Sequence, residues 1–444
     1  MPPADGAIVA LATPWGRAAL ALIRASGPDL GPLVTGWLEP MGARLTAGPP
    51  RRVRVRGPDG IVVDDGIAVW RRAPATYTGE DTLEVTVHGN PLLVEAGLAG
   101  AVAAGARLAS AGEFTRRAVL NGRMDLLAAE GVDQAIRATS LAGLRIARSG
   151  LDGDVRAAID PLREALLDVA AELEARLDYP ADELALLDDD ELVDRLYAIA
   201  DRARRLAATA DTGRLWVDGA RVALVGTVNA GKSSLFNRLY GKPRALVHPT
   251  PGTTRDVLEL PCAVDGLAVT LLDTAGERAT DDPVEAAGLA LARELLADAD
   301  LLVVVVPTDR PGDPVTAEIL ARTADRRRIV VGNGVDRAPA PPGTLGTSAL
   351  TGHGIAELAT AIRAALVGDA PRGDDLRLGS VRQRDLLQAL GSHAASAAEA
   401  LPVAGPAVAS EAVIAAVAEV DALTGADPRE AVLDTVFRRF CIGK

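Results

Sequence analysis

The stretch Val222-Ala-Leu-Val-Gly-Thr-Val-Asn-Ala-Gly-Lys-Ser-Ser234 decides the fold of this chain. A β-branched apolar run meets a loop with glycines at 226 and 231, and a helical pattern follows. The loop matches G-x-x-x-x-G-K-[ST], in which backbone N–H groups and a helix N-terminus converge on a polyphosphate. Lys232 is expected to reach the β and γ phosphate oxygens, and Ser233 to ligate Mg²⁺. The stretch predicts a strand, a phosphate loop and a helix that bind a nucleotide.

Length and composition narrow the possible classes of protein. At 444 residues the chain is expected to form several domains, and its net charge of −13 argues against a surface that is basic throughout. The two cysteines, Cys262 and Cys441, are far apart, and the four histidines show no metal-ligand spacing with them. The sequence shows neither the pattern of a signal peptide nor an apolar run long enough to span a membrane. We therefore expect a cytoplasmic protein without a disulfide framework.

The first domain, residues 1–118, is predicted to be α/β. Strands are expected at 7–11, 20–23, 51–56, 61–63, 66–70 and 83–88, with an acidic turn at Asp64-Asp65 and a helix over 91–104. Residues 51–56 alternate arginine with other side chains, which favours a half-exposed strand over a nucleic-acid patch.

A helical pattern occupies residues 119–217 and returns over 369–444. Helices are expected over 125–138 and over 161–177, the latter with Pro161 in its first turn. A last helix is expected to begin at Asp427 and to place Val432, Leu433, Val436, Phe437 and Phe440 on one face. The phosphate-loop region interrupts this helical pattern. The sequence therefore predicts a nucleotide domain, residues 218–368, inserted into a split all-α domain.

Partners of the phosphate loop follow in order within 218–368. The buried run 301–306 requires helices on both faces, which indicates a doubly wound parallel sheet. Asp273 ends a strand and is expected to hold the Mg²⁺ shell, while the N–H of Gly276 senses the γ-phosphate. Asn333 and Asp336 resemble the guanine-reading N-K-x-D motif, because a carboxylate accepts from both N1–H and N2–H₂ of guanine. The remaining nucleotide-binding candidates are Asn229, Ala230, Gly231, Ser234, Thr250, Gly252, Thr253, Thr254, Thr274, Ala275, Ser348, Ala349 and Leu350.

Two positions depart from the usual GTPase pattern. Gly334 stands where the guanine motif has a lysine whose stem packs along the base, which predicts a lower nucleotide affinity. Glu277 stands where Ras-like enzymes place a glutamine that orients the attacking water. The Ras mechanism is therefore not expected here.

Taken with these loops, the chain resembles the tRNA modification GTPase family MnmE, also called TrmE. The resemblance rests on Arg24-Ala-Ser-Gly-Pro28, Thr78-Gly-Glu-Asp81, Gly112-Glu-Phe-Thr115, Asn121-Gly-Arg-Met-Asp-Leu126 and the ending Phe440-Cys-Ile-Gly-Lys444. It implies a multidomain α/β protein: a tetrahydrofolate-binding-like N-terminal domain, a split helical domain and an inserted Ras-like G domain. It also implies a homodimer that acts with the FAD protein MnmG on the wobble uridine (position 34) of certain tRNAs. There the pair adds a (carboxymethyl)aminomethyl group at C5, using 5-formyl- or methylene-tetrahydrofolate.

The resemblance also assigns roles to residues. It implies that Asn229, His248, Thr250 and Thr253 hold K⁺, that Ser233 and Thr254 hold Mg²⁺, and that Glu285 is catalytic. It places a folate at Arg24, Glu84, Arg123 and Lys444. Cys441 is either chemically active or a buried residue that packs the C-terminal tail.

Two other functions remain open at this point. The first is a ribosome-assembly GTPase resembling Era or Der, which would require an RNA-binding domain after residue 370. The second is a folate-sensing scaffold that binds GTP but hydrolyses it poorly, as Gly334 and Glu277 allow.

Overall fold

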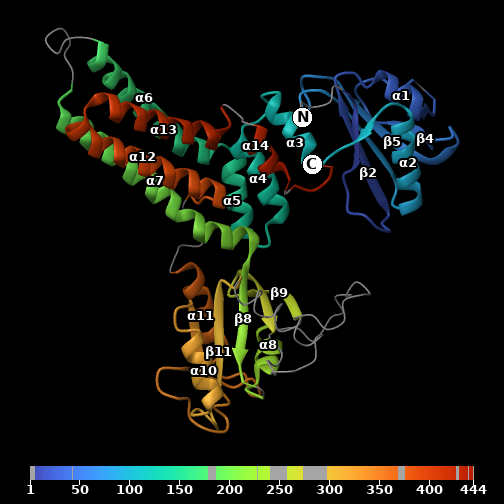
Figure 1. Ribbon diagram of the computed structural model, residues 1–444. Coiled ribbons are helices and arrows are strands. Elements are labelled where there is room, and N and C mark those ends of the chain that lie inside the picture. The colour runs from blue at the N-terminus through green and yellow to red at the C-terminus, as the bar shows by residue number, and fades with distance from the viewer. Residues whose placement is uncertain are drawn as a thin grey trace, which may run out of the picture. The chain divides into compact units, whose positions relative to one another are not determined.

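The computed structural model describes residues 6–42, 44–178, 187–227, 229–240, 258–273, 298–368, 376–426, 430–438 and 440–443. They form two compact units, one of Met1–Asp133 with Val417–Lys444 and the other of Gln134–Ala416. The boundaries between the units fall within helices α4 (Leu126–Arg137) and α13 (Pro406–Thr424) (Figure 1). Each unit is therefore described separately.

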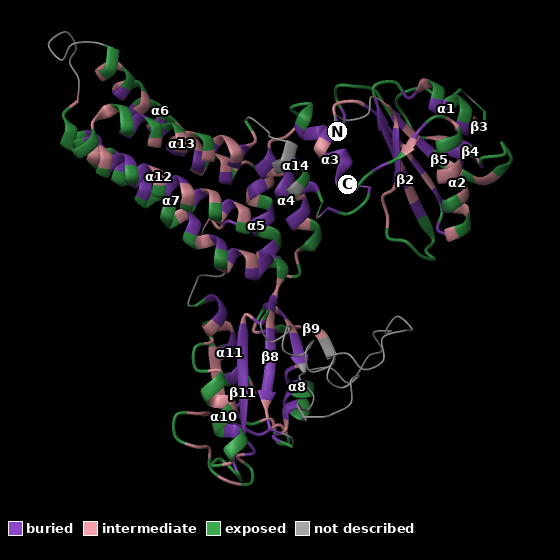
Figure 2. Ribbon diagram, viewed as in Figure 1, coloured by how far each residue is buried: buried purple, intermediate pink, exposed green. Residues whose placement is uncertain are grey.

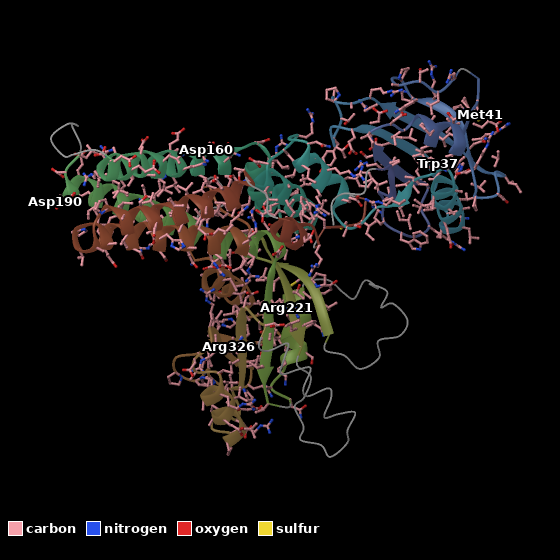
Figure 3. All side chains as sticks on the ribbon, turned by 45° about the horizontal axis from the view of Figure 1, so that its top comes forward. Trp37, Met41, Asp160, Asp190, Arg221 and Arg326 are labelled. Carbon is pink, nitrogen blue, oxygen red and sulfur yellow. The ribbon has the colours of Figure 1, made fainter. Side chains whose placement is uncertain are left out.

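The first unit is built on a seven-stranded sheet of order β3-β4-β5-β6-β2-β1-β7, antiparallel except for the parallel pair β1–β7. Helices α1 and α2 contribute to its core, in which Trp37 is fully buried (Figure 3). Helix α2 lies close to β4, since a Cβ on Gly100 would come within 1.9 Å of the Arg56 carbonyl oxygen. The elements are β1 (Ile8–Leu11), β2 (Leu20–Gly27), α1 (Gly31–Trp37), β3 (Leu38–Pro40), β4 (Arg51–Arg56), β5 (Val62–Arg71), β6 (Asp81–His88), α2 (Pro91–Ala103) and β7 (Arg107–Leu108).

The turn predicted at Asp64-Asp65 was wrong, because strand β5 runs through both residues. Asp64 accepts hydrogen bonds from the backbone N and the ring Nδ1 of His88, both at 2.8 Å. Gly66 lets β5 approach its neighbour, since a Cβ there would lie 2.7 Å from the Thr86 carbonyl oxygen. Cross-strand partners therefore outweigh the local turn preference of Asp and Gly.

Helices α3 (Glu113–Leu120), α4 and α14 (Glu430–Phe437) share a second core in the first unit. Leu433, Val436, Phe437 and Phe440 are buried there, which confirms the predicted apolar face for these four residues. Residues 427–429, where the helix start was predicted, and the side chain of Val432 lie outside the described part of the chain.

In the second unit, helices that precede and follow the nucleotide domain pack together. They are α5 (Leu141–Leu151), α6 (Asp154–Asp178), α7 (Asp189–Asp218), α12 (Val381–Ala404) and α13. Arg384 at the start of α12 donates to Asp211 of α7 at 2.8 Å, and Gly391 lies against Ala200. This packing confirms that one helical domain is built from both sides of the insertion.

Helix α6 begins earlier than predicted and contains Pro161 in its interior. A proline there removes one backbone hydrogen bond. Val155 and Ile159, which precede it, are buried, so the packing of the first turns offsets that loss.

The inserted domain contains a six-stranded sheet of order β13-β12-β11-β8-β10-β9, parallel except at β9. Successive side chains of β8 point to opposite faces of the sheet and so pack into two separate cores. Val222 and Leu224 pack with α8 and α11, whereas Ala223 and Val225 pack on the side of α10. Strand β11 is buried along its whole length (Figure 2). Helices thus cover both faces, as predicted for a doubly wound sheet. Its elements are β8 (Ala220–Gly226), α8 (Lys232–Tyr240), β9 (Leu258–Val264), β10 (Leu267–Asp273), β11 (Leu301–Pro307), α10 (Pro314–Arg322), β12 (Arg328–Asn333), β13 (Leu345–Thr347) and α11 (Ile355–Val367).

Across the described ranges, no helix is both long and apolar enough to span a bilayer.

The packing of α7 generates a stability prediction. Gly→Ala inside a helix ordinarily stabilises by about 1 kcal/mol. A Cβ at Gly213, however, would lie 1.9 Å from the Leu378 carbonyl oxygen. We expect Gly213→Ala to lower the free energy of unfolding by about 1–3 kcal/mol, as overpacking does, measured by denaturant unfolding followed by circular dichroism. Gly312→Ala, in the turn before α10 where a Cβ meets open space, is a control for the added methyl group. A Gly213→Ala protein at least as stable as the parent would contradict this packing.

Candidate functional site

The phosphate loop joins the end of β8 to the start of α8. The Lys232 ammonium donates to the carbonyl oxygens of Gly226 at 2.8 Å and Thr227 at 3.0 Å, so it lies across the loop. Asn229 has φ of +65°, a left-handed conformation that asparagine tolerates better than most residues. Ser233 and Ser234 are exposed in the first turn of α8, where helix N–H groups have no helical partner. This arrangement suits a bound polyphosphate.

Asn333 connects the guanine motif to the phosphate loop. Its buried side chain donates from Nδ2 to the Ala230 carbonyl oxygen at 3.0 Å. Its Oδ1 accepts from the Ala349 backbone N at 3.2 Å. Gly231 leaves the necessary space, since a Cβ there would lie 2.2 Å from Asn333 Nδ2. Asn333 thus holds together two loops that are far apart in sequence.

Asp336 presents the carboxylate that the sequence assigned to guanine. The buried Ser348 hydroxyl donates to Asp336 Oδ1 and also accepts from the backbone N of Thr351 at 3.1 Å. The Ser348 hydrogen bond lowers the pKa of Asp336 below its ordinary value, and the charge of Arg337 acts in the same direction. Asp336 is exposed and ionised at neutral pH, as an acceptor for the N1–H and N2–H₂ donors of guanine must be.

Arg238, which was not among the predicted site residues, supports the third loop of the site. From α8 it donates through Nε to the Ala349 carbonyl oxygen at 2.8 Å and through Nη2 to that of Leu350 at 2.7 Å. The helix that follows the phosphate loop is thereby tied to residues 348–350. No local pattern marks this arginine, because its partners are backbone atoms more than a hundred residues away in sequence.

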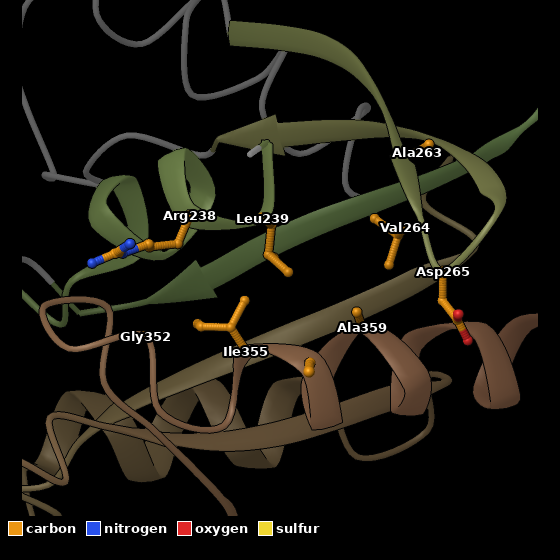
Figure 4. A pocket seen from close by; sticks show the side chains of 9 residues that line it. Arg238, Leu239, Ala263, Val264, Asp265, Gly352, Ile355 and Ala359 are labelled. Carbon is orange, nitrogen blue, oxygen red and sulfur yellow. The ribbon is translucent and has the colours of Figure 1, made fainter. Parts of the chain in front are cut away.

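Beside this contact lies a cavity of about 410 Å³ between α8, the β9–β10 turn and α11 (Figure 4). Most of its wall is aliphatic, and Asp265 at its edge pairs with Arg363 at 3.0 Å. It contains no residue of the phosphate loop or of the guanine motif, so it is not the nucleotide site. The lining residues are Arg238, Leu239, Ala263, Val264, Asp265, Gly352, Ile355, Ala356 and Ala359.

Several predicted site residues lie outside the described part of the chain. Asp273 is placed by its backbone at the end of β10, where it pairs with Leu224 of β8. Within the described ranges, no cluster of three His, Cys, Asp or Glu side chains suited to a metal was found. The predicted residues outside these ranges are His248, Thr250, Gly252, Thr253, Thr254, Thr274, Ala275, Gly276, Glu277, Glu285 and Lys444.

In the first unit, the structure brings two of the predicted folate residues together with the C-terminal tail. Arg24 donates from Nε and Nη2 to Glu84 Oε1 at 2.9 and 2.7 Å, across the β2–β6 pair. Its Nη1 donates to the Gly443 carbonyl oxygen at 3.3 Å. Among the described residues, Glu84 Oε2 accepts no hydrogen bond. This ion pair is partly buried and joined to the tail, which distinguishes it from an isolated surface pair.

Arg123 belongs to the neighbouring loop rather than to the Arg24–Glu84 pair. Its Nε donates to the Thr76 carbonyl oxygen at 3.1 Å, and its stem packs beside Gly79. Gly79 has φ of +79°, and a Cβ there would lie 3.1 Å from Arg123 Cγ. Arg123 therefore supports residues 76–79.

A buried polar network underlies this loop and was not predicted. Arg117, which is 5% exposed, donates to Glu80 at 2.9 Å and to Glu113 at 3.2 Å. The Ser26 hydroxyl contacts Thr78 at 2.7 Å and Glu80 at 3.0 Å. Buried charges require such partners, so the network stabilises the Thr78–Asp81 segment.

The tail itself is seated by backbone contacts. Ile442 forms an antiparallel bridge with Ala111, and the Gly112 N–H donates to the Cys441 carbonyl oxygen at 3.3 Å. Gly443, with φ of +93°, passes so close to β1 that a Cβ would lie 2.4 Å from the Leu11 carbonyl oxygen. Cys441 is exposed, so the alternative of a buried packing cysteine was wrong. Cys262, in contrast, is partly covered, and burial raises its pKa to about 11, which keeps it a neutral thiol.

Comparison with known proteins identifies the family of this chain. Residues 7–123 match the family described as the GTP-binding protein TrmE N-terminus, and residues 126–441 match the MnmE helical domain. A relative from Chloroflexus aurantiacus is 40% identical over 453 residues, covering 98% of this chain and 99% of its own length. Relatives from Roseiflexus sp. (strain RS-1) and Thermotoga maritima are each 37% identical, covering 99% and 98% of this chain and 99% of their own lengths. All three are named tRNA modification GTPase MnmE, and the chain belongs to that family of GTP-hydrolysing enzymes.

Proposed function

We propose that this GTPase is stimulated by K⁺ through dimerisation of its G domains. We further propose that it acts as a homodimer with the FAD-dependent protein MnmG to add a (carboxymethyl)aminomethyl group at C5 of the wobble uridine of certain tRNAs. A folate bound in the N-terminal domain supplies the one-carbon unit. The proposal that GTP is the bound nucleotide rests on the contact of Asn333 with Ala230. This contact holds the loop that carries the Asp336 carboxylate at a fixed distance from the phosphate loop.

The described part of the loop fits the proposed ions. The exposed Ser233 hydroxyl at the start of α8 is suited to Mg²⁺, an ion that prefers oxygen ligands and retains several waters. Asn229 is exposed in the same loop and offers an amide oxygen to K⁺. Bound next to the β–γ bridge, K⁺ would supply positive charge that stabilises the transition state, as an arginine finger does in other GTPases.

The first unit supports a folate ligand by its chemistry. The Glu84 carboxylate suits the paired amino and ring N–H donors of a pterin, and Arg24 suits carboxylates. Both are partly exposed, and Arg24 holds the tail that carries Cys441. Lys444, which is also predicted to bind folate, follows Gly443 in sequence. The tail would therefore complete this site.

The two competing functions have less support. A ribosome-assembly GTPase would need an RNA-binding domain after residue 370, whereas the described residues there form α12, α13 and α14. A folate-sensing scaffold with weak turnover differs from the proposal in GTP hydrolysis rather than in architecture. Turnover measurements therefore separate it from the proposed enzyme.

The guanine assignment generates a prediction of nucleotide specificity. Asp336→Asn places an amide donor opposite the N2–H₂ donor of guanine, so we expect GDP affinity to fall about 100-fold or more. Xanthosine diphosphate, which has a carbonyl oxygen at that position, is expected to bind the variant better than GDP. Both affinities are measured by calorimetry. Asp313→Asn is the control, since Asn caps α10 as well as Asp does. Unchanged GDP affinity in Asp336→Asn would remove Asp336 from the site.

The catalytic assignment generates a prediction for turnover. In KCl, Glu285→Ala is expected to bind GTP normally and to lose about 100-fold or more in kcat, because water orientation is lost while the phosphate loop is intact. The parent protein is expected to turn over more slowly when NaCl replaces KCl. Glu318→Ala, on the exposed surface of α10, is the matched control. An unchanged kcat for Glu285→Ala in KCl would exclude the proposed role.

The position of Cys441 generates a prediction for tRNA modification. Cys441→Ser removes the nucleophilic thiol from an exposed tail outside the G domain. We expect GTP turnover to be retained and wobble-uridine modification to be lost, as measured by mass analysis of tRNA from a reconstituted reaction with MnmG. Cys262→Ala is the control. Normal modification by Cys441→Ser would show that the thiol has no chemical role.

A further inference from the structure

The guanine motif lacks its usual lysine, and the structure places another cation at that point. Gly334 has φ of +105°, a conformation that residues with side chains rarely adopt. A Cβ built on Gly334 would lie 2.6 Å from Arg337 Nη2 and 2.9 Å from Thr308 Oγ1. The space into which a side chain at position 334 would extend is therefore filled by the Arg337 guanidinium and the Thr308 hydroxyl.

Arg337 is held in this place from several directions. Its Nη1 donates to Asp309 Oδ2 at 2.8 Å, and its backbone N donates to the Gly334 carbonyl oxygen at 2.8 Å. The buried Thr308 donates from Oγ1 to the same carbonyl oxygen at 2.7 Å. Its backbone N donates to the carbonyl oxygen of Asn333 at 3.1 Å. The loop after β11 and the loop after β12 thus form one unit that orients the guanidinium.

The remaining surface of Arg337 is open. About half of its side chain is exposed, and it follows Asp336, whose carboxylate is assigned to the edge of the base. A guanidinium is planar, always charged and weakly hydrated, so it stacks well on aromatic rings. A lysine stem covers a base with aliphatic carbon, whereas a guanidinium would cover it by stacking and by a cation–π interaction.

We propose that Arg337 takes the place of the missing lysine and covers one face of the guanine base while Asp336 reads its edge. This inference rests on the proposed guanine site. Gly334 alone would lower the affinity for the nucleotide, and in this proposal the contact of Arg337 with the base maintains it.

The test compares a ligand that has a base with one that does not. Calorimetry on the full chain with Mg²⁺ measures binding of GDP, ADP and inorganic tripolyphosphate. Arg337→Ala is expected to bind GDP about tenfold more weakly and to bind tripolyphosphate as the parent does, because only the base contact is removed. Arg337→Lys is expected to recover much of the GDP affinity, and Arg337→Gln to recover less, since it lacks the charge. Arg310→Ala is the control, since Arg310 is also exposed beside Asp309, whereas the atoms nearest to a Cβ at Gly334 belong to Arg337 and Thr308.

The outcomes separate this inference from the guanine site itself. If the parent prefers GDP to ADP while Arg337→Ala and Arg337→Gln bind GDP with parental affinity, the role of Arg337 is refuted and the site stands. An equal loss of GDP and tripolyphosphate binding would assign Arg337 to loop structure and would also refute the inference. A parent that does not distinguish GDP from ADP would refute the guanine site. Thermal unfolding of each variant shows whether it is folded, and the Lys and Gln variants decide the question if the Ala variant is not.

Discussion

The hydrogen bond from Asn333 Nδ2 to the Ala230 carbonyl oxygen is the constraint on which the nucleotide site depends. It is buried, and its loss would leave the Nδ2 donor without this acceptor, which costs about 1–3 kcal/mol. The same side chain accepts from Ala349, so one residue fixes the phosphate loop, the guanine motif and the 348–350 loop together. Gly231 is required at its position because any Cβ would collide with this amide.

Arginines perform much of the positioning in both units. Lysine occurs only at positions 232, 242 and 444, so 44 of the 47 basic residues are arginine. Arg24, Arg117 and Arg238 each join segments that are distant in the chain by donating two or more hydrogen bonds to carboxylates or carbonyls. A planar fork with several donors bridges two acceptors at once, which a single ammonium does less well. The proposed role of Arg337 follows the same principle in a motif that ordinarily uses lysine.

Many features could be predicted from local pattern because local physics determines them. The apolar run 222–225 and the glycines at 226 and 231 specify a strand and a loop whatever lies nearby. The fully buried run of β11 implied a sheet covered on both faces, as observed. Predictions failed where tertiary partners overrode local preference: β5 continues through Asp64 and Asp65 because His88 and Arg54 bind them, and α6 contains Pro161 because its first turns are buried.

By itself, the sequence determined the class of nucleotide domain, its insertion between two helical segments and the family to which the chain is similar. These follow from short motifs and periodic patterns, in which the interacting atoms lie within a few residues of one another. Only the tertiary structure decided that Arg238 supports the 348–350 loop, that Arg117 is buried beneath Thr78–Asp81 and that Arg24 holds Gly443. It also placed Arg337 in the space beside Gly334. Each of these features depends on contacts between residues that are far apart in the sequence. No sequence pattern links such residues, because only folding brings them within hydrogen-bonding distance.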